Sequence, residues 1–128
     1  MWFDPKIMAA YEEAIEPAIG RAGFTSMMIG NKEHSNRIDD EIISEIRRSA
    51  FVIADFTGHR GGVYFEAGFA MGLGLPLIWT CHKDDMPNLH FDIRQYNCID
   101  WTDHRDLHVR LQKRITALFG QGPVRPAA

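Results

Sequence analysis

The segment Phe51-Val52-Ile53-Ala54 is the feature that most restricts how this chain can fold. It is a continuous apolar run of strand length, which is typical of a parallel strand covered on both faces of a sheet. Asp55 ends the run, and a glycine-bearing loop then leads into an apolar segment that starts near Val63. This succession of strand, loop and helix predicts an α/β domain with residues 51–54 at the centre of its sheet.

The rest of the chain alternates between helical and extended patterns in the same way. Apolar spacing predicts helices over residues 5–22, 38–49, 63–73 and from 103 onward, and strands over 24–29, 77–80 and 98–101. We expect Gly23 to close the first helix and Pro17 to kink or split it. Only three residues precede Asp4-Pro5, so either they are the stub of a truncated first strand or the sheet has only the later strands.

Length and charge limit the class of protein. The 128 residues are enough for one domain, 1–128, with a frayed tail from about Gly120. The net charge of -3 disfavours binding to a nucleic acid polymer. The longest apolar segment, 65–79, is too short and too rich in glycine to span a membrane. Two cysteines, Cys81 and Cys98, are too few for a disulfide framework, so we expect reduced thiols in a cytoplasmic protein.

Glu66 is the strongest candidate for a catalytic residue. We expect it in the first turn of the third helix, where the helix dipole stabilises a carboxylate and small Ala67, Gly68 and Ala70 would let another group approach. Such a carboxylate can attack an anomeric carbon or stabilise an oxocarbenium-like transition state. The simpler interpretation is that Glu66 is an ordinary acidic residue of a helix start and that the glycines serve packing.

Other polar residues are expected at the same edge of the sheet, because open parallel sheets bind ligands beyond the carboxyl ends of their strands. Asp55 could orient Thr57 or a ligand, or it could cap its own loop through an Asx turn. The guanidinium of Arg60 suits a phosphate or a carboxylate. Asp92 and Arg94 could contact a ligand or pair with each other in a self-satisfied polar loop.

Metal ions and cofactors are not expected. His104 and His108 share a helix but have no obvious third ligand, and no Cys-x-x-Cys spacing occurs. The glycines at 58, 61 and 62 match neither a Walker loop nor a dinucleotide-binding fingerprint.

The string ADFTGHRGGVYFEAGFAMGLGLPLIW, residues 54–79, resembles the nucleoside 2-deoxyribosyltransferase family, in which an apolar strand, an Asp and a small loop precede a Glu-x-Gly-x-Ala motif. A looser match covers nearly the whole chain. The resemblance implies a flavodoxin-like three-layer fold with four to five parallel strands. It also implies that Glu66 is the nucleophile that forms a glycosyl-enzyme, and that Asp40, with Asp39 beside it, contacts the leaving base. Arg60-Gly61-Gly62 departs from the Asn or Asp that many members carry there.

The expected function is therefore cleavage or transfer at the N-glycosidic bond of a nucleoside or nucleotide. Candidate substrate-binding residues are Asp39, Asp55, Thr57, Arg60, Tyr64, Asp92 and Arg94. A homodimer or larger assembly is expected, because in the family a neighbour closes the pocket and because Phe91, Tyr96 and Trp101 are hard to bury in a small domain. Two alternatives stay open: a TIR-like domain that cleaves NAD or senses a nucleotide, and a non-catalytic nucleotide-binding module.

Overall fold

The computed structural model describes residues 5–28, 40–58, 61–88 and 97–123. These residues form two compact units. One comprises the described residues from 28 to 100 and contains most of the sheet. The other comprises residues 5–27 and 101–123 and is almost entirely helical.

The sheet-bearing unit alternates helix and strand. Its elements are α3 (Asp40–Arg48), β1 (Val52–Asp55), α4 (Gly61–Gly72), β2 (Leu77–His82), the 3-10 helix η2 (Lys83–Asn88) and β3 (Ile99–Trp101), whose last residue belongs to the other unit. The strand order is β1-β2-β3. β1 and β2 run parallel, with Val52 opposite Leu77 and Asp55 opposite Thr80. The predicted α/β class and the predicted strand at 51–54 are confirmed. The described residues form three strands, and β2, not β1, is the middle one, so the expectation that residues 51–54 form the centre of the sheet is wrong for the described strands.

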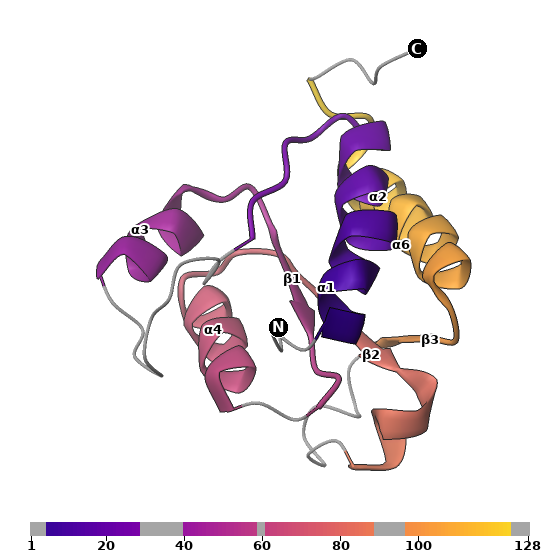
Figure 1. Cartoon of the computed structure of the whole chain (residues 1–128). Helices are drawn as coiled ribbons and strands as arrows, with labels where there is room; N and C mark the ends of the chain where they lie inside the picture. The colour runs from indigo at the N-terminus through magenta and orange to yellow at the C-terminus, as the bar shows by residue number, and fades with distance from the viewer. Residues whose placement is uncertain (1–4, 29–39, 59–60, 89–96, 124–128) are drawn as a thin grey trace. The chain divides into compact units, whose positions relative to one another are not determined.

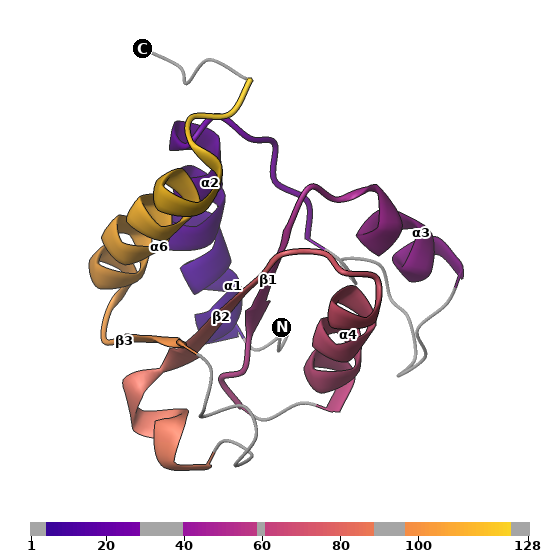
Figure 2. The ribbon, with the colours of Figure 1, turned by 180° about the vertical axis from the view of Figure 1, so that it is seen from behind.

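One helix and two strands make the core of this unit. α4 lies along β1 and β2 (Figures 1 and 2) and presents Val63, Ala67 and Ala70 to them. Their spacing of four and three residues places all three on one face of the helix. From α3, Ile42 and Ile46 are buried against Val52 and Ala70, and their spacing of four residues places both on one face of the helix.

The helical unit begins with a single helix that changes its winding midway. α1 (Pro5–Ala10) continues as a π-helical segment, η1 (Tyr11–Ile15), and then as α2 (Glu16–Arg21). The Glu16 N–H donates to the Tyr11 carbonyl, five residues back, and Pro17 follows directly. Because Pro has no N–H and its ring crowds the carbonyl four residues back, the wider π turn accommodates it without breaking the helix. The irregularity predicted at Pro17 is therefore a π turn, not a split.

The end of α2 explains why the strand expected at residues 24–29 is absent over 24–28. Gly23, at φ 90°, ends the helix as predicted. The Gly23 N–H donates to the Gly20 carbonyl and the Phe24 N–H to the Ile19 carbonyl, both at 3.0 Å, which is the Schellman arrangement. Phe24 also places its ring edge-on against Phe119, with centroids 6.4 Å apart. Its backbone and its side chain both serve the helical unit, so the expectation of a strand there is wrong for the described residues.

α6 (His104–Phe119) completes the helical unit as the predicted C-terminal helix. Asp103 caps it by accepting from the Asp106 N–H at 2.7 Å, and Leu107, Leu111 and Ile115 are buried. The tail expected to fray after Gly120 is held at its start, because the Gly122 N–H donates to the Ala22 carbonyl at 2.7 Å. No helix within the described ranges is long and apolar enough to cross a membrane.

Candidate functional site

The carboxyl ends of β1 and β2 carry a buried polar network centred on Asp55. Asp55 is only 2% exposed. Its Oδ1 accepts from the Thr57 N–H at 3.0 Å, which is the Asx turn weighed above. Its Oδ2 accepts from the Thr80 hydroxyl at 2.6 Å, across the two strands. The parallel register explains this bond, because it puts Asp55 directly opposite Thr80.

Two further hydrogen bonds extend the network into the following loops. The His82 N–H donates to Thr57 Oγ1 at 2.9 Å, and the Gly58 N–H donates to Asp85 Oδ2 at 2.8 Å. Thr57 thus receives a bond from the end of β2 while its own backbone is held by Asp55. The strand ends, the loop after β1 and the start of η2 are tied together by side chains that each satisfy a backbone donor.

An aromatic cluster lies directly beside this network. Phe56 is fully buried and stacks on Trp79 with centroids 5.2 Å apart and ring planes within 16°. Tyr64, on α4, also packs against the Phe56 ring, with the two ring centroids 4.8 Å apart. Tyr64 is half-buried, so part of its side chain belongs to the core and part faces outward.

Glu66 lies in the second turn of α4, not in the first. The helix begins at Gly61, two residues earlier than expected, and no acidic residue stands in its first turn. Glu66 follows Val63 by three residues and precedes Ala70 by four, so it lies on the flank of the buried face and is half-buried itself. Burial raises the pKa of the Glu66 carboxyl above its usual value of 4.5. Desolvation, rather than the helix dipole, sets the chemistry of this carboxyl.

Two of the three small residues around Glu66 pack against the sheet. Ala67 and Ala70 are buried and bring α4 close to the strands. Gly68 is exposed, two residues further along the helix and on a different face from Glu66. Ala67 and Ala70 therefore serve helix–sheet packing, and the expectation that the small residues let another group approach stays a prediction.

Cys81 is a buried thiol, and it forms no disulfide with the half-buried Cys98. Burial raises its pKa, and the nearby carboxylates of Asp55 and Asp85 add to the rise. The hydrogen bond with Thr57 opposes this shift without cancelling it. A thiol held neutral in this way is not a nucleophile at physiological pH.

The structure describes some of the predicted site residues and brings only part of these together. It brings Asp55 and Thr57 together, and it sets Tyr64 and Glu66 two residues apart on α4. Asp40 is the first residue of α3 and is exposed. Asp39, Arg60, Asp92 and Arg94 lie outside the described residues.

Sequence reasoning missed Thr80, His82 and Asp85. A usable signal was present for Thr80, because Asp55 and Thr80 each end an apolar run of similar length, and adjacent parallel strands align such ends. His82 and Asp85 gave no comparable signal. His82 contributes its backbone N–H, and Asp85 stands in a polar stretch that contains several equivalent carboxylates.

Among the described residues no group of three or more His, Cys, Asp or Glu side chains is arranged to hold a metal ion. No protein-family model, no curated protein and no solved structure shows a significant match to the chain.

Proposed function

We propose that this chain cleaves or transfers the N-glycosidic bond of a nucleoside or nucleotide, with Glu66 as the nucleophile. The observation that carries the proposal is the half-buried carboxyl of Glu66 on α4, the helix that follows β1. A carboxylate with few water contacts is more reactive toward an electrophilic carbon than a fully hydrated one. The sequence resemblance at residues 54–79 adds the nucleoside specificity. The parallel sheet is compatible with the flavodoxin-like layout that this resemblance implies.

The proposed reaction has two steps. An ionised Glu66 oxygen bonds to C1′ while the bond from C1′ to the base nitrogen breaks, and the base leaves with the electron pair. Asp40, at the start of α3, would contact the leaving base and supply its proton. Water or a second base then attacks C1′ and gives its proton back to Asp40, while the bond from C1′ to Glu66 breaks and releases the carboxylate, which completes hydrolysis or transfer. Asp55 and Thr57 act in this scheme as the fixed edge against which the substrate rests.

The test is release of free base from a panel of deoxynucleosides, nucleoside monophosphates and NAD, followed by chromatography. We expect release from at least one nucleoside or nucleotide by the unaltered chain, and a loss of at least about a thousandfold in Glu66→Gln, because an amide cannot form the ester. Glu12→Gln, which neutralises an exposed carboxylate on η1, is the matched control and should keep full activity.

Other outcomes would redirect the proposal. Release from NAD alone would favour a TIR-like activity with the same bond chemistry. Full activity in Glu66→Gln would remove the nucleophile assignment. No release from any substrate would favour a nucleotide-binding module without catalysis.

The proposal includes association of two or more copies, with a second copy covering α4. The expected reason was partly wrong, because Trp101 is buried within the chain, and Phe91 and Tyr96 lie outside the described residues. The support comes instead from Phe65 and Met71, which are exposed on α4. A helix that is apolar on nearly every side normally has all of its faces covered.

A further inference from the structure

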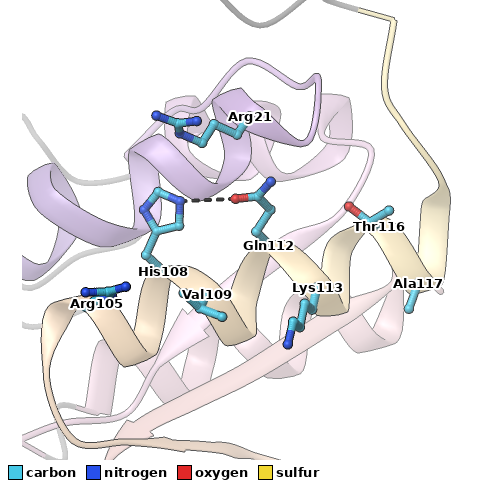
Figure 3. A pocket seen from close by; sticks show the side chains of 8 residues that line it. All are labelled: Arg21, Arg105, His108, Val109, Gln112, Lys113, Thr116 and Ala117. Carbon is cyan, nitrogen blue, oxygen red and sulfur yellow. Dashed lines mark hydrogen bonds between the residues drawn. The ribbon is translucent and has the colours of Figure 1, made fainter.

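The helical unit contains an open groove along α6 that no part of the proposed reaction uses. Its volume is about 720 Å³, within the range of about 300–1,000 Å³ that small-molecule sites occupy. Arg21 from the end of α2 borders it, and Arg105, His108, Gln112 and Lys113 from α6 line it. Figure 3 shows His108 and Gln112 rising from α6 toward α2, where Arg21 lies above them, with Arg105 at one end and Lys113 on the outer side.

The charged residues in the lining are all basic. Arg21, Arg105 and Lys113 line the groove, and none of the described acidic residues does. In the described part of the chain, none of these three side chains forms an ion pair. Three positive charges around one groove, with no carboxylate to balance them, create a local field that attracts an anion.

Three acidic side chains of the helical unit are engaged elsewhere, and the exposed Glu12 and Glu16 do not line the groove. Glu13 pairs with His104, and Asp106 binds Thr102 and lies 3.5 Å from Arg110. Asp103 is occupied as the cap of α6. The positive charge of the groove lining is therefore not neutralised by these carboxylates and can attract an anionic ligand.

Between the arginines the groove also offers neutral hydrogen-bonding groups. His108 Nε2 and Gln112 Oε1 are 3.1 Å apart and hold each other in place. This bond leaves the Gln112 amide NH₂ as a donor, while Val109 adds an apolar surface. A ligand with anionic groups at its end and a planar or apolar body matches this arrangement.

We infer that this groove binds a small phosphorylated molecule, with Arg21 and Arg105 on its phosphate groups. Guanidinium groups bind phosphate through paired donors. The combined positive charge of Arg21, Arg105 and Lys113 matches the multiple negative charge of a phosphorylated molecule better than the single charge of one carboxylate. A small ligand is favoured over a nucleic acid polymer because the whole chain carries a charge of -3, which repels a long polyanion beyond the groove. The site is independent of Glu66 and does not need the proposed reaction.

Titration calorimetry at low salt tests this inference with inorganic pyrophosphate, ADP and adenosine as probes. We expect pyrophosphate and ADP to bind in a way that depends on Arg21 and Arg105, and any binding of adenosine at the proposed Glu66 site to be independent of both arginines. Arg21→Gln and Arg105→Gln should each weaken the Kd for pyrophosphate by about tenfold, the effect of losing one charge-assisted hydrogen bond. Arg47→Gln removes the same charge from an exposed position on α3 and should change the Kd less than twofold.

Each contrary result overturns the inference. Absence of heat with both pyrophosphate and ADP shows that the groove holds no phosphate. Equal weakening by Arg47→Gln and Arg105→Gln shows a general effect of net charge. Adenosine binding that Arg21→Gln and Arg105→Gln weaken as much as they weaken ADP binding, or a thymidylate 12-mer binding more tightly than ADP, assigns the groove to a different ligand. Circular dichroism of each variant confirms that it has folded.

Discussion

Asp55 shows how one buried carboxylate organises the end of a sheet. It satisfies a backbone donor of its own loop and the hydroxyl of the neighbouring strand at the same time. Removing it leaves two buried donors without an acceptor, and each such loss costs roughly 1–3 kcal/mol. Asn differs from Ala here, because its carbonyl can still accept from the Thr57 N–H and the Thr80 hydroxyl can turn to accept from its NH₂.

We therefore expect Asp55→Ala to lower the free energy of unfolding by about 2–4 kcal/mol and Asp55→Asn by less than about 1.5 kcal/mol. Urea denaturation of both variants measures the difference. Equal losses in Ala and Asn would show that the charge of Asp55, and not its two hydrogen bonds, stabilises the fold.

Glu66 makes stability depend on pH in a direction that the helix dipole alone would not predict. Because burial raises its pKa in the folded chain, folding favours the neutral carboxyl. The resulting stabilisation is complete below the ordinary pKa of 4.5 and is lost as the pH rises through the higher folded pKa. Glu66→Gln stays neutral at every pH. Its melting temperature should match that of the unaltered chain near pH 4 and exceed it at pH 8. A lower melting temperature at pH 8 would mean that the folded chain favours the ionised form.

At the residue scale the sequence predicted which side chains stand at the sheet edge better than it predicted what they do. Asp55 and Thr57 were predictable because polar residues that end a buried strand must lie at its edge. Their partner Thr80 depended on the register between two strands, which is set by packing in three dimensions. The position of Glu66 within the helix depended on where α4 begins. A shift of two residues in that start moved Glu66 out of the first turn.

Glycines in and beyond α4 illustrate two opposite uses of the same residue. A Cβ on Gly68 would meet nothing within 4 Å, and the position is inside a regular helix. Gly74 has φ 75° and closes α4, with the Leu75 N–H donating to the Ala70 carbonyl at 3.0 Å. Only the second glycine has a backbone conformation that other residues avoid.

Gly68→Ala should therefore stabilise the chain by about 0.5–1 kcal/mol, and Gly74→Ala should destabilise it by about 1–2 kcal/mol. Thermal unfolding of the two variants side by side gives the signs. A destabilising Gly68→Ala would show that another molecule or a second copy approaches the helix closely at that position.

Helix boundaries followed from the sequence wherever a glycine ended a helix, and strands followed wherever the apolar run was continuous. The strand expected at residues 24–29 failed because Phe24 is needed to complete the end of α2 and to pack on Phe119. The π turn at Tyr11–Ile15 was not predictable in detail, since Pro17 can be accommodated in several ways and the neighbouring α6 selects among them.

At the scale of the whole molecule, α4 gives the reason to expect more than one copy. Phe65 is 55% exposed and Met71 is 44% exposed, on a helix that has only one charged residue. Burying two such side chains between copies contributes about 1.5–3 kcal/mol each.

Light scattering coupled to size-exclusion chromatography should give the mass of a dimer or a larger assembly. Phe65→Asp should reduce that mass, while Met27→Asp, which changes an exposed apolar residue in the other unit, should not. A monomer mass for the unaltered chain at high concentration would contradict the expectation.

The network at the strand ends also sets how fast this edge of the sheet can change shape. The amide hydrogens of Thr57, Gly58 and His82 are all bonded to side chains of the same network. None of them can exchange with deuterated solvent until its hydrogen bond to Asp55, Thr57 or Asp85 breaks. We therefore expect the exchange of all three to be slowed together, as one opening event. A ligand that arrives there meets a surface that is already ordered. Its association rate would then be governed by diffusion and orientation rather than by closure of a loop.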